Sequence, residues 1–265
     1  MKKLLCLLVV ILVSAIALAQ TNKTPKQIRK EEKRKRIDAL IKQEEEGVIA
    51  YHKQTVYGVK LNTDGYGVFL EIGRSKSVKK AMLFQFEFTE RKHYKEEKQS
   101  GVNFFSAPFI YGKINFFYPI KLGVQQQILL GNKSNKNGVT VTGNFGGGLT
   151  LGFLRAYEIE LDKAGTRTFV RYDSPDSLLF RNAYNDQTAS GPGFANGWKK
   201  LKLTPGLYIK PAVRFDYGKL NELVSALEVG LNLELYSKKI PQMLDIKQKQ
   251  LFFSAFVALQ FGKRK

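Results

Sequence analysis

The sequence predicts an all-β protein: an eight-stranded antiparallel transmembrane β-barrel preceded by a short charged N-terminal helix. Two observations lead to this prediction. First, apolar residues recur at every second position in long runs, most clearly over residues 203–217, 223–235 and 251–261, and a period of two is the period of a β-strand. Second, these runs exceed the usual soluble strand of about five or six residues and match the roughly 9–11 tilted residues that cross a bilayer.

The first residues are typical of a secretory signal peptide. A basic start precedes an apolar run from Leu4 to Ile16, and Ala17-Leu18-Ala19 then matches an A-x-A cleavage site. The only cysteine, Cys6, lies inside this segment. We therefore expect a mature chain that contains neither a thiol nor a disulfide.

Three parts of the chain follow from these patterns. Residues 1–19 are the expected signal peptide, residues 20–48 a charged periplasmic helix or linker, and residues 49–265 the barrel. In the second part, Thr24-Pro25 has the features of a helix start, and the helix should stop near Gly47. Its first half is basic and its apolar stripe is thin, which indicates a solvated helix or a basic arm that contacts headgroups or a partner.

The net charge of the chain limits the kinds of partner that it could bind. The formal net charge is +20 at pH 7, which could indicate nucleic acid, but an exported chain rarely meets nucleic acid and we expect none. Outer-membrane lipid, lipopolysaccharide or an acidic envelope protein is the expected counter-charge. No segment after the leader offers 18 consecutive apolar residues, which excludes a helical membrane protein.

Five upstream runs complete the eight strands, because they show the same alternation. They cover approximately residues 54–62, 66–74, 81–91, 114–130 and 139–158. Residues 62–65 have the composition of a tight hairpin turn.

The lengths of the connections support this count of strands. Long connections at residues 92–113, 159–202 and 237–250 alternate with short ones. Outer-membrane barrels have short periplasmic turns and long external loops. With both termini in the periplasm, all the long connections are predicted to be external.

The inward face of the strands carries ionic residues. The candidates for the lumen are Lys60, Glu71, Glu87, Lys121, Lys210, Arg214, Asp216, Glu228 and Glu234. An eight-stranded barrel is just wide enough to be filled by its side chains, and we expect Lys210 and Arg214 to face the two carboxylates of the following strand. A buried charge without a partner costs several kcal/mol. We therefore expect a structural plug, with a proton or ion path as the alternative.

Catalytic signals are sparse. His93 with Ser100 or Ser106 could form part of an esterase that trims lipopolysaccharide acyl chains, but the chain has no spacing signature for one. Asp173 and Asp176 resemble a loose cation site, although two acids in a loop more often form a turn. We predict no catalytic residue, no cofactor and no metal.

Several short motifs carry a resemblance to a known family. They are Lys92-His93-Tyr94-Lys95-Glu96, Tyr111-Gly112-Lys113-Ile114-Asn115-Phe116-Phe117-Tyr118, Asn137-Gly138-Val139, Leu151-Gly152-Phe153-Leu154-Arg155, Pro205-Gly206-Leu207-Tyr208, Lys239-Ile240-Pro241 and Phe261-Gly262-Lys263-Arg264. Over about residues 54–264 the chain resembles an uncharacterised family of Bacteroidota outer-membrane β-barrel proteins, although Tyr94 and Ala156 stand where proline is expected. The resemblance implies an exported protein of the cell outer membrane and no settled substrate or catalytic residue.

Four functions remain open at this point. The first is a structural or interaction protein that displays loops 92–113 and 159–202, for example as an accessory of an envelope secretion, uptake or assembly machine. The others are a narrow transport path, a lipid-modifying barrel enzyme and a soluble lipocalin-like carrier. A soluble carrier would hide its apolar faces inside, so the direction of the two strand faces distinguishes it from a membrane barrel.

Overall fold

The computed structural model describes nine stretches of the chain: residues 27–35, 51–77, 79–99, 107–132, 138–163, 166–172, 177–182, 189–218 and 222–265. The chain forms two compact units, Met1–Val48 and Ile49–Lys265. In the first unit, residues 27–35 are helical and exposed. The predicted signal peptide and the remainder of the predicted helix lie outside the described residues. Within the described residues, no helix is long and apolar enough to span a membrane.

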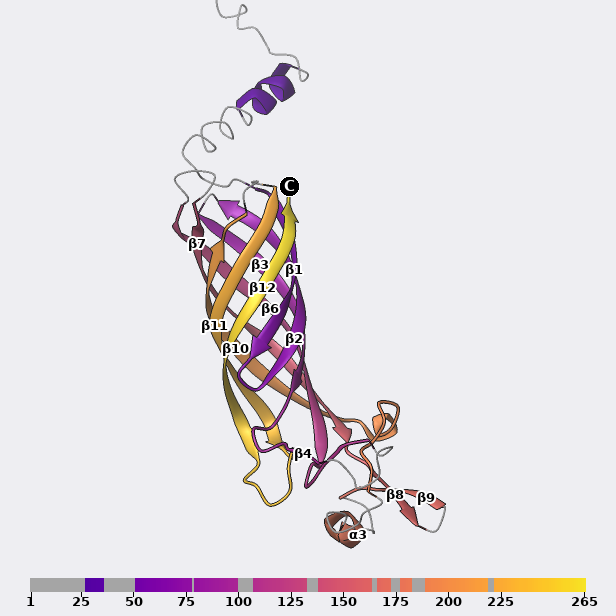
Figure 1. Cartoon of the computed structure of the whole chain (residues 1–265). Helices are drawn as coiled ribbons and strands as arrows, with labels where there is room; N and C mark the ends of the chain where they lie inside the picture. Colours follow the sequence, from indigo (N-terminus) through magenta and orange to yellow (C-terminus); the bar gives the residue numbers. More distant parts are fainter. Residues whose placement is uncertain are drawn as a thin grey trace, which may run out of the picture. The chain divides into compact units, whose positions relative to one another are not determined.

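Eight long strands of the second unit close into an antiparallel barrel (Figure 1). They are β1 Lys53–Asn62, β2 Gly65–Ser77, β3 Lys80–Arg91, β6 Asn115–Gly131, β7 Thr140–Ala156, β10 Lys202–Asp216, β11 Leu223–Ile240 and β12 Lys249–Arg264. Each of them pairs with its neighbours in this order, and β1 closes the ring against β12. The predicted eight-stranded antiparallel barrel is confirmed, and the expected runs lie on the eight strands in order.

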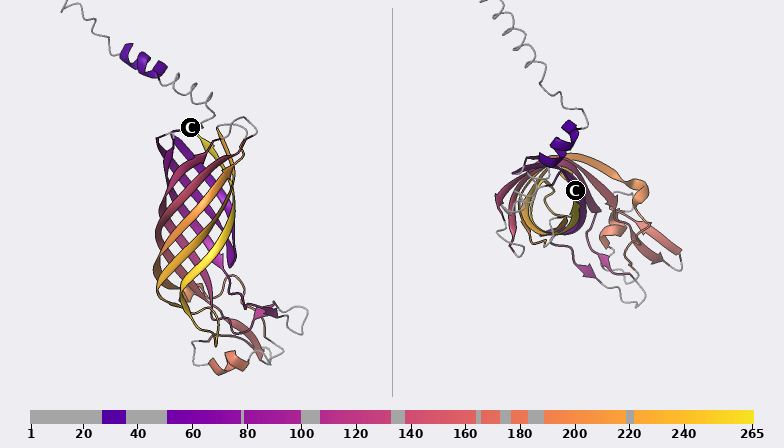
Figure 2. Two further views of the ribbon diagram at one scale, coloured as in Figure 1. Left: turned by 90° about the vertical axis from the view of Figure 1, so that its left-hand side faces the viewer. Right: turned by 90° about the horizontal axis from the view of Figure 1, so that it is seen from above.

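Both chain ends of the barrel lie at one end of it. The pairing of β1 with β12 begins at Gln54 opposite Arg264, and the backbone N–H groups of His52 and Lys53 each donate to the Lys265 carbonyl at 2.8 Å. We call this the terminal end. The longer connections leave the opposite end, which we call the loop end, as Figures 1 and 2 show.

The two faces of the barrel wall differ in chemistry. Along β1, exposed and buried residues alternate strictly: Tyr57, Val59 and Leu61 are at least half exposed, whereas Val56 and Lys60 are fully buried. Apolar side chains also cover the outward positions of the other strands. In water this surface would far exceed the apolar patch of a few hundred Å² that soluble monomers tolerate. The wall therefore has the apolar exterior and polar interior of a transmembrane barrel.

Glycines in the middle of strands allow close approach inside the barrel. A Cβ atom on Gly123 of β6 would lie 2.3 Å from the hydroxyl oxygen of Tyr208, so the absence of a side chain lets this ring enter the lumen. On β7, a Cβ atom on Gly148 would lie 2.2 Å from the Leu122 carbonyl oxygen. The close packing of β6, β7 and β10 depends on these positions.

The loop end carries its own small elements within the predicted long connections. They are the strands β4 Lys98–Gln99, β5 Phe109–Ile110, β8 Ile159–Lys163 and β9 Thr166–Val170, the helix α3 Ser177–Asn182 and the 3-10 helix η2 Trp198–Lys200. β4 pairs with β5, and β8 pairs with β9. A hydrophobic cluster, which we call the loop core, holds β5, β8, β9 and α3 together: Phe109, Ile110, Tyr157, Ile159, Leu161, Val170, Phe180, Ala189 and Met243.

One part of the outer wall is covered by a loop. Tyr118 has the outward parity of β6, but it is only 7% exposed because Trp198 stacks on it with ring centroids 5.9 Å apart. The Arg155 guanidinium lies 3.9 Å from the Phe116 ring centroid and donates to the Phe194 carbonyl at 2.7 Å. Tyr118 is therefore covered by protein although its parity is outward, since the chain before β10 folds back over this end of the wall.

Candidate functional site

The structure places all nine candidate ionic residues inside the barrel. None of them is more than 2% exposed. They project from β1, β2, β3, β6, β10 and β11, because in each of these strands the inward parity carries the charge. The candidate site is therefore a set of desolvated charges, and its contacts decide whether it can act as a plug.

Arg214 is the centre of the half of the network that lies toward the terminal end. Its Nε and Nη2 atoms donate to Glu228 Oε2 at 2.9 and 2.7 Å, and Nη2 also donates to Glu71 Oε2 at 2.5 Å. Lys210 Nζ lies 2.8 Å from the other Glu228 oxygen. Two side-chain amides donate to Glu228 at 2.9 Å each. Glu228 is thus bound by cations of the neighbouring strand β10, and Glu71 of β2 is bound by the same cations across the lumen.

Lys121 joins a second group of charges. Its Nζ lies 2.7 Å from Glu234 Oε1 and 2.9 Å from Glu87 Oε1. Glu234 also accepts from the Arg91 guanidinium at 2.8 and 3.1 Å, and Glu87 forms an ion pair with Lys60. Strands β1, β3, β6 and β11 are therefore tied together through the interior as well as through the sheet.

The expected pairing of Glu234 with Lys210 or Arg214 is wrong. The register of β10 with β11 sets Arg214 opposite Glu228, as expected, but it sets Tyr208 opposite Glu234. Glu234 reaches instead to the far side of the lumen, where Arg91 and Lys121 bind it. Contacts across the lumen depend on the tilt of the strands, which a single hairpin does not define.

Three ionic residues of the network were missed from the sequence. Arg91 forms an ion pair with Asp64 at 2.7 Å, and Arg264 forms one with Asp216. Both arginines have the inward parity of their strands, and this signal could have identified them. Asp64 lies in the turn between β1 and β2, where the alternation of faces stops, so the sequence offered no comparable signal.

Formal charge balances within this network. Six cations meet six carboxylates: Lys60, Arg91, Lys121, Lys210, Arg214 and Arg264 with Asp64, Glu71, Glu87, Asp216, Glu228 and Glu234. Aromatic rings fill the space beside it; the Lys60 amine lies 4.1 Å from the Phe256 ring centroid, for example. The net charge of +20 therefore resides outside the network, and the interior is a neutral plug.

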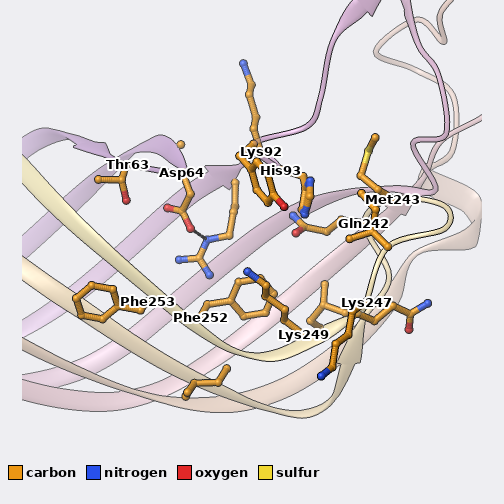
Figure 3. A pocket seen from close by; sticks show the side chains of 17 residues that line it. Thr63, Asp64, Lys92, His93, Gln242, Met243, Lys247, Lys249, Phe252 and Phe253 are labelled. Atoms are coloured by element: carbon orange, nitrogen blue, oxygen red, sulfur yellow. Dashed lines mark ion pairs between the residues drawn. The ribbon is translucent and has the colours of Figure 1, made fainter.

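A cavity of about 510 Å³ opens at the loop end (Figure 3). It exists because the β1–β2 hairpin is short. The N–H of Thr63 donates to the Ala255 carbonyl at 2.9 Å, and the described residues give β12 no partner on this edge between Lys249 and Ser254. We call this gap in the barrel wall the notch.

Basic and apolar side chains line the notch together. Lys247 and Lys249 are exposed on its rim, and Leu251 and Phe253 present their outward faces beside them. His93 lies on the opposite side, and its partial burial lowers the pKa of the imidazole by more than the charge of nearby Glu96 raises it; the charge of Lys249 adds to the lowering. The notch therefore combines positively charged side chains with an apolar surface.

The residues considered for catalysis do not form a site among the described residues. Ser100, Ser106, Asp173 and Asp176 lie outside them. The Nδ1 atom of His93 accepts the backbone N–H of Lys95 at 3.3 Å. Its neighbour Glu96 accepts the backbone N–H of His93 at 2.9 Å and pairs with Lys113 at 2.5 Å. These contacts order the loop at the end of β3.

No family model and no curated protein matches the chain. Solved structures give weak matches. Neisserial surface protein A is 11% identical over 81% of this chain and 96% of its own, with a TM-score of 0.37. Ail, the attachment invasion locus protein of Yersinia pestis, is 9% identical over 82% of this chain and 100% of its own, with a TM-score of 0.38. The N-terminal β-barrel domain of Pseudomonas aeruginosa OprF is 8% identical over 80% of this chain and 98% of its own, with a TM-score of 0.35. With identities and TM-scores this low, these proteins carry no argument about function.

Proposed function

We propose that the chain is an outer-membrane β-barrel that acts as a platform: a filled barrel that holds its folded loops at the cell surface for interaction with another envelope component. One observation carries this proposal. Loops 92–113 and 159–202 meet in a single loop core, with Tyr157, Phe109 and Phe180 all buried, on a barrel whose interior is neutral and filled. Ordered external loops on a barrel with a filled lumen favour a role in displaying the loops over a role in transport.

The outer-membrane location rests on the apolar exterior of the barrel and on the predicted signal peptide. A wall of strands with apolar residues outward and ion pairs inward suits a bilayer. The partners that fit are membrane lipid or lipopolysaccharide around the wall, and an envelope protein bound through the two long loops or the basic N-terminal helix. An accessory of a secretion, uptake or assembly machine would have this design.

The filled lumen weighs against a narrow transport path. A path for ions or protons needs polar groups that can exchange partners or admit water, and Glu71, Glu87, Glu228 and Glu234 are all held by cations. Breaking a buried pair leaves an uncompensated charge at a cost of about 3–5 kcal/mol. The contacts therefore support a plug.

Labelling of single cysteines tests the display. In a Cys6→Ser chain, Leu178→Cys places a thiol on the exposed face of α3, and Lys76→Cys places one at the terminal end. We expect a membrane-impermeant maleimide to label Leu178→Cys in intact cells, and to label Lys76→Cys only after the outer membrane is permeabilised. Equal labelling of both in intact cells, or the reverse order, would contradict the proposed orientation.

A further inference from the structure

The notch lies beside the loop core, and Met243 belongs to both. It interrupts the wall where the β1–β2 hairpin stops at Thr63-Asp64 while β12 continues to Lys249. A closed barrel has no free strand edge, but here six residues of β12 lack a strand partner on one side within the described part of the chain. A ligand in the notch would cover this edge.

The outer rim of the notch belongs to the lipid-facing surface. Leu251 and Phe253 are 54% and 65% exposed, and they have the same outward parity as Val257 and Leu259 farther along β12. Leu61 of β1 is 67% exposed and belongs to the same surface. An apolar chain that lies along the barrel wall can thus follow this surface into the notch without crossing a polar barrier.

Positively charged side chains line the notch beside the apolar rim. Lys247 and Lys249 are exposed, and Asp64 is the one acidic residue that lines the cavity in the described structure. Its carboxylate is already paired with Arg91, at 2.7 Å. Lys92 extends away from the cavity in Figure 3, with its amine 5.0 Å from the Tyr66 ring centroid, and does not contribute. The two lysines therefore line the cavity, and among the described residues no unpaired carboxylate lines it with them.

We propose that the notch binds one membrane lipid whose phosphate headgroup carries a net negative charge. The acyl chains lie along Leu251 and Phe253, and the phosphate lies between Lys247 and Lys249. The volume of about 510 Å³ is within the range of about 300–1,000 Å³ that is usual for small-molecule sites. The inference rests on the membrane location proposed above, and it adds a specific lipid contact to it.

Quenching of tryptophan fluorescence by brominated lipids tests this site. The chain has one tryptophan, Trp198, so Phe253→Trp in a Trp198→Phe chain places a single reporter on the rim. The refolded full chain is placed in vesicles of phosphatidylcholine and phosphatidylglycerol in which one or the other lipid is brominated. We expect brominated phosphatidylglycerol to quench this reporter more strongly than brominated phosphatidylcholine at equal mole fraction.

The matched reporter is Leu259→Trp, which lies on the same strand and the same face but away from the notch. The two brominated lipids should quench it equally. Lys247→Gln with Lys249→Gln should reduce the preference for phosphatidylglycerol at the Phe253→Trp reporter by about fivefold for each lysine. Lys76→Gln with Lys79→Gln removes two exposed lysines at the terminal end and should leave the preference unchanged.

The contrary outcomes separate the two proposals. Equal quenching of the Phe253→Trp reporter by both lipids would overturn the lipid site and leave the display function standing. A Leu259→Trp reporter that neither lipid quenches would contradict the membrane location itself. If excess inorganic phosphate abolishes the preference, the notch takes free phosphate, and the assignment to a lipid is wrong.

Discussion

The lumen and the loop core both exclude water, and they do so with opposite chemistry. In the lumen, Arg214 and Lys121 each bridge two carboxylates among fully buried groups. In the loop core, buried aromatic and aliphatic side chains such as Phe109 and Phe180 pack together. Polar residues alternate with apolar ones along much of each strand, and because the exterior of the barrel is apolar, these polar residues must point into the interior. The loops have no such constraint and form an ordinary hydrophobic core.

This difference predicts two kinds of sensitivity. A buried ion pair needs both partners, because a single remaining charge is left without solvent. A small hydrophobic core loses stability in proportion to the volume that is removed, and the damage stays local. Changes in the lumen should therefore weaken the whole barrel, whereas changes in the loop core should loosen the loops alone.

The largest effect is expected for Arg214→Ala. It removes one of the two cations that pair with both Glu71 and Glu228, and leaving two buried carboxylates with Lys210 alone should cost about 3–5 kcal/mol of unfolding free energy. The measurement is urea unfolding of the refolded barrel in lipid vesicles.

The neighbouring position is the control. Val213→Ala removes only a contact with lipid and should change the free energy of unfolding little, whereas Val213→Arg at the lipid-facing position should cost about 2–4 kcal/mol. If Val213→Ala destabilised the barrel and Val213→Arg did not, the two faces would be inverted and a soluble carrier would be the better description.

A smaller, local effect is expected for Phe180→Ala. Phe180 is 1% exposed in the loop core, and its truncation should lower the free energy of loop opening by about 3 kcal/mol. Tryptic cleavage within residues 157–201 should then accelerate about 100-fold, with no change in the urea unfolding of the barrel. Leu178→Ala on the exposed face of the same helix should leave the rate as it is. A loss of barrel stability in Phe180→Ala would show that the two regions are not independent.

The smallest effect concerns pH. Burial raises the pKa of Tyr157 to about 12, and its hydroxyl oxygen accepts the Ile110 N–H at 2.7 Å. Because the phenol holds its proton more tightly in the folded loop than in an unfolded chain, its contribution is intact below pH 10. This contribution to the stability of the folded loop, about 2–3 kcal/mol, is lost as the pH rises from 10 to about 12. The difference in tyrosinate absorbance between wild type and Tyr157→Phe should titrate near pH 12; a midpoint near 10 would contradict the burial.

The wall and the inward set of charges could be predicted from the sequence, because a period of two assigns each residue to a face without knowledge of its neighbours. Lys60 and Glu228 needed only this parity. The partners of Glu234 could not be predicted, since Arg91 and Lys121 lie on strands that are not adjacent to β11, and contacts across the lumen depend on tilt and register together.

Neither the loop core nor the notch could be predicted from the alternation of residues along the strands. Strands β8 and β9 have five residues each, which is too short for alternation to distinguish them from a loop. The notch results from the unequal ends of β1 and β12, a difference of a few residues that turn chemistry alone does not define. Both features depend on long-range contacts rather than on a local pattern.

The conductance of the purified barrel tests the sealed platform most directly. The full chain is refolded, inserted into a planar lipid bilayer and recorded at constant voltage. Because Glu71, Glu87, Glu228 and Glu234 are held by cations inside a filled lumen, we expect no stable channel. Reproducible open pores of nanosiemens scale would show that the lumen is not sealed, and a transport path would then replace display as the function of the barrel.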